Sequence, residues 1–178
     1  VESAPVQVVT WDQSVAGDIH WNQAQPLVGN SDVATNGALK YAVLWGGTPA
    51  TVNGVAFTVA GGNATIDNTN VNVGTIPPTG LSTAYKNILN GQIMPNSITL
   101  NNLVPGRQYQ VQVWSIQKWN ATNTMTELAG VPSVDLFNNP GQYAIGIFAA
   151  GGTTQTISAS GIGSFSAVNA LQVRELTQ

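Results

Sequence analysis

The stretch GNSDVATNG, residues 29–37, holds the side chains of this chain that are best suited to bind a hard cation. Asp32 supplies a carboxylate and Asn30 an amide oxygen. Backbone carbonyls of the same loop could complete a calcium site, which takes about six to eight oxygens. The spacing is not that of an EF-hand, and the loop offers a single acid. The alternative is that both side chains hydrogen-bond their own loop as Asx turns. Calcium is therefore the only cofactor that the sequence suggests.

The residue types and motifs give little support for an enzyme. The single histidine, His20, has no cysteine partner and no metal-binding frame, and the motifs of P-loop, dinucleotide-binding and nucleophile-elbow enzymes are absent. A glycosidase-type carboxylate pair is the remaining option, and it would need the fold to bring two acids together. We expect a protein that is not an enzyme. The acids are Glu2, Asp12, Asp18, Asp32, Asp67, Glu127, Asp135 and Glu175.

Five tryptophans are many for a chain with so few charges. Carbohydrate-binding sandwiches stack sugar rings on exposed aromatic side chains, while neighbouring amides contact the sugar hydroxyls. Trp119, with Asn120 beside it, ends a strand-like run and enters a polar loop, and Trp45 precedes Gly46-Gly47 at a possible rim. These three residues form the candidate sugar site, whereas Trp11 and Trp114 are expected in the core or in subunit contacts.

The composition favours neutral partners. Charged residues make up 7% of the 178-residue chain, against about a quarter in an ordinary soluble domain. Asn and Thr, eighteen of each, supply the polarity instead. Such a surface favours packing against like copies or against polysaccharide. The five scattered basic residues exclude nucleic acid, and no apolar run is long enough to span a bilayer. The absence of Cys and the scarcity of Lys indicate an extracellular protein.

Short β-rich runs separated by Gly, Asn and Pro dominate the chain. The clearest is RQYQVQV, in which Tyr109, Val111 and Val113 face one way and three glutamines face the other, as in a half-buried antiparallel strand. The residues at 143, 145 and 147 repeat this pattern. The predicted strands are 5–11, 38–45, 55–60, 97–101, 107–118, 142–149, 153–159 and 168–176.

One helix is predicted over 83–90, with Ser82 as its N-cap. Tyr85, Ile88 and Leu89 are spaced to share one face of it. The stretches 61–80 and 119–141 are expected to be long loops. Eight strands, one short helix and one core predict an all-β protein, an antiparallel, jelly-roll-like β-sandwich that forms a single domain over residues 1–178.

Six stretches, in order and covering most of residues 28–176, resemble a module of secreted surface proteins of planctomycetes and verrucomicrobia, many of which carry a PEP-CTERM tail read by an exosortase. The resemblance implies an extracellular β-sandwich with a role in surface display, matrix or polysaccharide attachment, and it carries over no catalytic residue. The end Leu176-Thr177-Gln178 departs from that pattern, because it has no Pro-Glu-Pro, apolar span or basic end, so a free secreted subunit is expected. The stretches are GNSDVATNGALKYAVLWGG, TVNGVAF, LSTAYKNIL, ITLNNLVPGRQYQVQVWS, GQYAIGIFAAGGTTQTI and VNALQVREL.

Two functions fit these features. In the first, the chain is an extracellular structural subunit that self-assembles into a filament, sheath or matrix, as a homo-oligomer or polymer. The strand over residues 1–11, with Val6, Val8 and Val9 as contacts, would then pair with a neighbouring subunit or within its own sheet. The alternative is a non-catalytic carbohydrate-binding module that uses exposed tryptophans.

Overall fold

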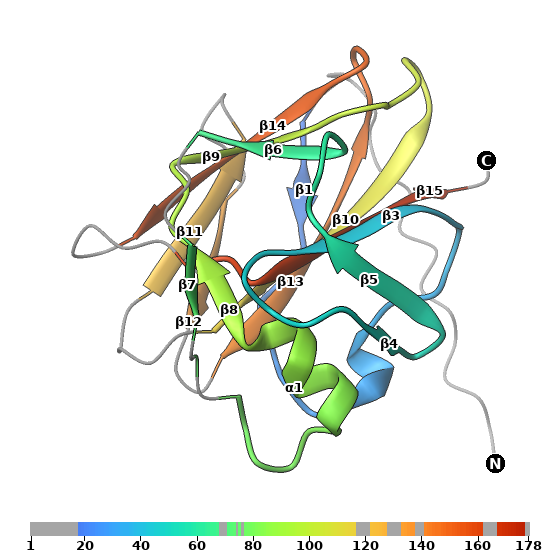
Figure 1. The fold of residues 1–178 in the computed structure, drawn as a ribbon. Helices are drawn as coiled ribbons and strands as arrows, with labels where there is room; N and C mark the ends of the chain where they lie inside the picture. Colours follow the sequence, from blue (N-terminus) through green and yellow to red (C-terminus); the bar gives the residue numbers. More distant parts are fainter. Residues whose placement is uncertain are drawn as a thin grey trace, which may run out of the picture.

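Two β-sheets packed face to face form the body of the protein, and one short α-helix covers the outer side of the larger sheet (Figure 1). The all-β sandwich with one short helix that the sequence predicts is therefore confirmed. No helix among the described residues is long and apolar enough to cross a membrane. The computed structural model describes residues 18–67, 71–73, 75, 77–116, 122–127, 133–137, 141–161 and 167–176.

The larger sheet has the order β1-β13-β10-β15-β3-β5-β4, and β2 also pairs with β13. Its pairs are antiparallel except for β3 and β5, which run parallel. The β4–β5 hairpin turns at Asn53 and Gly54, both with positive φ, as the Asn-Gly signal predicts. The bounds are β1 His20–Trp21, β2 Gln25–Pro26, β3 Ala38–Leu44, β4 Ala50–Val52, β5 Val55–Val59, β10 Gln108–Ser115, β13 Gln142–Ala149 and β15 Ala170–Leu176.

The second sheet has the order β12-β11-β14-β9-β6, and β7 and β8 form a separate antiparallel pair. Its inward residues, among them Ile98, Leu100 and Ile157, meet Tyr109, Val111 and Val113 of β10 in the main core. The alternation of β10 therefore places its apolar side where the sequence predicts. The bounds are β6 Ala64–Ile66, β7 Val71–Val73, β8 Gly91–Ile93, β9 Ser97–Leu100, β11 Thr122–Glu127, β12 Ser133–Phe137 and β14 Gln155–Gly161.

Helix α1, Thr83–Leu89, begins where the sequence predicts. The Ser82 side chain accepts a hydrogen bond from the backbone N–H of Tyr85 at 3.2 Å, as an N-cap does. The residues expected on one face, Tyr85, Ile88 and Leu89, are buried in a second apolar cluster on the outer side of the larger sheet. A short 3₁₀ turn, η1 (Asn30–Asp32), lies in the loop before β3.

Seven of the eight predicted strands are present, and the eighth, 5–11, lies outside the described residues. The two stretches expected to be loops are predicted wrongly, because 61–80 contains β6 and β7 and 119–141 contains β11 and β12. These segments are short and rich in Asn and Thr, so their own sequence gives a weak strand signal. They are strands because their neighbours offer backbone partners: β9 pairs with β6, and β14 pairs with β11.

Strand β13 shows the predicted alternation with its faces reversed. Ala144 and Phe148 point into the main core, whereas Tyr143, Ile145 and Ile147 lie on the outer side of the sheet and are only partly buried. We call these three outward residues the β13 strip.

The reversal has a steric cause at the edge of the sheet. Trp21 of β1 is paired with Gly146 in register, and its ring packs across that glycine. A Cβ on residue 146 would lie 2.9 Å from Cε3 of Trp21 and 2.5 Å from Cγ2 of Ile19. The inner side of β13 therefore takes small residues beside the edge strand, and the isoleucines are left outside.

Candidate functional site

The loop 29–37, which we call the strap, lies across the outer face of β10 and is held there by buried glutamines. Gln112 is fully buried, and its Nε2 donates to the backbone oxygen of Asp32 at 2.6 Å. Its Oε1 accepts from the backbone N–H of Ala34 at 3.0 Å and from Nε2 of Gln172 at 2.7 Å. Gln110 and Gln112 were expected on the open side of a half-buried strand. That expectation is wrong, because the strap covers them.

Arg174 of β15 fixes the far end of the strap. Its guanidinium donates to the backbone oxygens of Thr35, Asn36 and Gly37, at 3.0, 2.7 and 2.9 Å, and to Oε1 of Gln172 at 3.3 Å. Only arginine offers enough donors in one plane to satisfy three consecutive carbonyls. Desolvation lowers the pKa of Arg174 from its ordinary value.

Asp32 anchors the near end of the strap to helix α1. Its Oδ2 accepts from the backbone N–H groups of Val28 and Gly29, at 2.8 and 3.1 Å, and from the Tyr85 hydroxyl at 3.1 Å. The same hydroxyl accepts from Nε1 of Trp114 at 2.8 Å. Burial, and then the Asp32 charge, raise the pKa of Tyr85. The carboxylate thus organises a buried polar corner between the strap, the helix and the sheet.

The hydrogen bonds of Asp32 and Asn30 limit how these two residues could bind the expected calcium ion. Three donors already point at Oδ2 of Asp32, so this oxygen is occupied by the loop and by helix α1 and does not favour a cation. The Asn30 Oδ1 accepts from the Ser82 hydroxyl at 2.6 Å. Among the described residues, no group of three His, Cys, Asp or Glu side chains could hold a metal. The contacts favour the alternative in which both residues shape their own loop.

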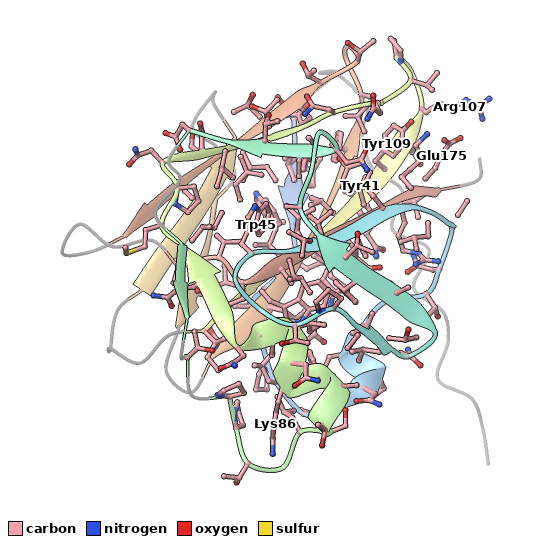
Figure 2. All side chains as sticks on the ribbon, viewed as in Figure 1. Tyr41, Trp45, Lys86, Arg107, Tyr109 and Glu175 are labelled. Carbon is pink, nitrogen blue, oxygen red and sulfur yellow. The ribbon has the colours of Figure 1, made fainter. Side chains whose placement is uncertain are left out.

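The tryptophan expected at the rim is not available for stacking. Trp45 is 6% exposed and packs in the main core, with its backbone N–H bonded to the Asn169 oxygen at 2.9 Å (Figure 2). Its expected role as a sugar platform is therefore wrong. Trp119 and Asn120, the other members of that site, lie outside the described residues, as do Val6, Val8 and Val9 of the expected assembly strand.

The β13 strip offers an alternative platform that the sequence analysis missed. Tyr143 packs against Trp114, with ring centroids 6.3 Å apart and planes tilted by 38°, while its own ring stays partly exposed. Burial, and then the Asp32 charge, raise the pKa of Tyr143. The signal that could have found it was the alternation of β13, read with small residues inward.

Polar groups border the strip on both sides. In register, His20 of β1 stands opposite Ile147, and Gln25 of β2 stands opposite Tyr143. On the other side lies β10, whose outer face carries the strap. From Tyr143 to Ile147 the strip extends over about 13 Å, given a rise of about 3.3 Å per strand residue. It is a partly exposed apolar line with one aromatic ring, bordered by uncharged amides and one imidazole.

An ion pair lies just beyond the Ile147 end of the strip, where the Arg107 backbone oxygen accepts from the Ala150 N–H at 2.9 Å. Arg107 and Glu175 form an ion pair at 3.4 Å, with side chains 59% and 24% exposed, next to the Tyr109 hydroxyl (Figure 2). An exposed pair of this kind contributes little free energy. It joins a cation to an acid, so it is not the carboxylate pair of a glycosidase.

Comparison with known proteins finds solved structures of similar fold but identifies no family for this chain. No family model matches the chain, and no curated protein matches it. Among solved structures, a calcium-binding mutant of Bacteroides uniformis beta-glucuronidase 2 is similar with a TM-score of 0.60 and 10% identity, over 77% of this chain. The chain spans only 18% of that protein. The CBM22-1 xylan-binding domain of Paenibacillus barcinonensis Xyn10C has a TM-score of 0.41 and 9% identity, over 82% of this chain and 99% of that one. At such identities the likeness concerns the fold alone.

Proposed function

We propose that this protein is an extracellular, non-catalytic carbohydrate-binding module, and that the β13 strip is its contact surface for polysaccharide. The observation that carries the proposal is the outward position of Tyr143, Ile145 and Ile147. Apolar residues of a central strand ordinarily face the core, so a partly exposed line of them beside an aromatic ring is informative.

The chemistry of the strip suits a polyol chain. The C–H faces of a sugar ring stack on an aromatic side chain and on aliphatic residues, while hydroxyls hydrogen-bond with flanking amides. Gln25 and the strap supply such groups, and the 7% charge content leaves little long-range field to attract a strongly ionic polymer. An elongated strip suits a chain better than a monosaccharide.

The competing function, a self-assembling structural subunit, rests on the segment 1–11. That segment lies outside the described residues, so the contacts of Val6, Val8 and Val9 stay predictions from sequence. The strip, in contrast, places an aromatic ring beside a bordering amide, and this is why we favour polysaccharide over a second copy of the chain.

Affinity electrophoresis in gels containing soluble polysaccharides, followed by calorimetry on any polymer that retards the protein, tests the proposal. Tyr143→Ala should weaken binding about tenfold, because it removes an aromatic contact of about 1.4 kcal/mol. The matched control is Val59→Ala, which shortens an apolar side chain that is 64% exposed on β5, outside the strip, and should leave affinity unchanged.

Three outcomes separate the alternatives. Loss of binding in Tyr143→Ala alone supports the strip. Loss in Trp119→Ala, with Tyr143→Ala still binding, would return the site to the residues expected from sequence. If no polysaccharide retards the protein and sedimentation shows concentration-dependent polymers, the self-assembly function replaces this one.

A further inference from the structure

A row of hydrogen-bond donors runs across the larger sheet beside the β13 strip. Cross-strand pairing places His20, Ile147, Gln110 and Arg174 in one line on the outer face, from β1 through β13 and β10 to β15. We call Gln110 and Arg174 the donor row, and Ile147 connects it to the strip.

Only the oxygen of the Gln110 side-chain amide has a hydrogen-bond partner among the described residues. Its Oε1 accepts from Nδ2 of Asn36 at 2.9 Å, whereas its Nε2 is buried and has no hydrogen-bond partner in the part of the chain that the structure describes. The residue is only 4% exposed. A buried donor without an acceptor is costly, so it indicates an oxygen that the protein itself does not supply.

Arg174, next to Gln110 in register, carries a positive charge that no described carboxylate pairs with. It is 7% exposed, and its hydrogen bonds among the described residues all go to neutral oxygens of the strap and of Gln172. None of the described carboxylates forms an ion pair with it. The donor row therefore combines an unsatisfied N–H with an uncompensated cation, and both favour a negatively charged oxygen.

We infer that the polysaccharide bound at the β13 strip carries a uronic acid residue, whose carboxylate accepts a hydrogen bond from Nε2 of Gln110 beside Arg174. This inference rests on the proposed function. The carboxylate enters past Ile147, whose partly exposed side chain lies between the donor row and the edge strand. Because the strap covers Gln110 and its amide nitrogen is closed to solvent in the free protein, entry requires both the Ile147 side chain and the strap at Asn36 to move aside.

The other end of the strip limits how many carboxylates the ligand carries. Asp32 is linked through the Tyr85 hydroxyl to Trp114, on which the Tyr143 ring packs, and its negative charge disfavours a second negative charge at that end. The donor row and Asp32 thus give the strip a positive and a negative end. The ligand class that fits is a mainly neutral chain with occasional uronic acid substituents, bound in one direction.

The test uses two forms of one polymer: xylan substituted with glucuronic acid, and the same xylan after its carboxyl groups have been reduced to alcohols. The protein should bind the acidic form about tenfold more tightly, the gain from one charge-assisted hydrogen bond. Gln110→Glu keeps the side-chain shape and replaces the donor with an acid, so it should abolish this preference. Gln108→Glu, the same change two residues earlier on the same face of β10, should keep it.

Each outcome is decisive. Equal affinity of the unmodified protein for both polymers overturns the inference and leaves the proposed function standing, and it would assign the Gln110 donor to an ordered water. Binding to neither polymer, nor to any other in the panel, overturns both. If Gln110→Glu fails to fold, the ¹⁵N side-chain signal of Gln110 replaces it. That signal should shift with the acidic polymer, and a shift of equal size with the reduced polymer would refute the inference.

Discussion

Strands β10 and β13 are neighbours in one sheet, and their outer faces reverse the usual distribution of polar and apolar residues. On β10 the outward Gln110 and Gln112 are covered by the strap and nearly excluded from water. On β13 the outward tyrosine and isoleucines are partly exposed. Burial of polar side chains and exposure of apolar ones are the two observations about a surface that carry information, and here they lie side by side.

The difference follows from what each face must satisfy. The strap is irregular backbone, and its N–H and C=O groups need partners wherever they leave water. Gln112, Gln172 and Arg174 supply those partners, so their burial serves the fold. Nothing comparable accounts for the β13 strip, whose residues have no such role in holding the strap. The polar face therefore mainly holds the strap, apart from the unused Nε2 of Gln110, and the apolar face is the larger surface that is free to bind.

The largest expected effect tests this contrast within one cross-strand pair. Gln112 and Ile145 stand opposite each other in register. Gln112→Ala should lower the free energy of unfolding by about 3 kcal/mol, because it leaves the Asp32 oxygen and the Ala34 N–H without partners and removes one of the two acceptors of the Gln172 Nε2. Ile145→Ala, at a partly exposed site, should cost about 1 kcal/mol. Urea unfolding of both variants measures the difference.

An equal or larger loss for Ile145→Ala would contradict the contrast, since the β13 strip would then be a packing surface. Gln108→Ala serves as the control for removing a glutamine side chain from the same strand. Its side chain is partly exposed and does not contact the strap in any described hydrogen bond, so its effect should stay near zero.

Sequence reasoning succeeded where a segment's own pattern decides its structure. The alternation of β10, the N-cap at Ser82 and the Asn53-Gly54 turn are local signals, and the structure confirms each. It failed where contacts with a distant segment of the chain decide the structure. The orientation of β13 depends on Trp21 packing across Gly146, more than a hundred residues away in sequence.

The buried polar residues show the same difference between local signals and contacts with distant segments. The sequence analysis proposed Asp32 as a calcium ligand, with a loop-shaping role as the alternative, and its hydrogen bonds to the loop favour that alternative. Its further partner Tyr85 comes from a helix 53 residues later. Asn169, Gln172 and Arg174 lie together in the run VNALQVREL, and no local rule separates them from solvent-exposed polar residues of a strand. Their roles arise only when β8, β10 and the strap surround β15.

A smaller effect probes the buried corner beneath the strap. Tyr85→Phe should cost about 2 kcal/mol, because the Asp32 carboxylate loses a donor and the Trp114 N–H loses its acceptor. The pH dependence gives an independent readout. Burial raises the pKa of Tyr85 above its ordinary value of 10.0, so its stabilising effect is complete below pH 10 and is lost as pH rises further, when only the unfolded chain ionises.

Urea unfolding between pH 8 and pH 11 measures both parts. Above pH 10 the unmodified protein should lose more stability per pH unit than Tyr85→Phe, by about 1 kcal/mol. Parallel curves for the two proteins would show that the Tyr85 hydroxyl ionises equally in both states and does not hold the corner together.

The smallest effect concerns Asp67, an exposed counterpart of Asp32. Burial alone would raise the pKa of Asp67, but hydrogen bonds from the backbone N–H groups of Ser97 and Asn96, at 3.0 and 2.9 Å, lower it below the ordinary value of 3.8. Its stabilising effect is therefore present above pH 3.8 and disappears as pH falls through the lowered folded-state pKa.

Asp67→Asn should cost about 0.5 kcal/mol at pH 7, because the amide oxygen can still accept both bonds and only the charge is lost in a solvent-screened site. At pH 2 the difference from the unmodified protein should vanish, since both side chains are then neutral. Thermal unfolding at the two pH values measures it. A loss as large as that of Tyr85→Phe would show that the loop before β9 depends on its carboxylate as strongly as the strap does, and burial would then not be what sets the two acids apart.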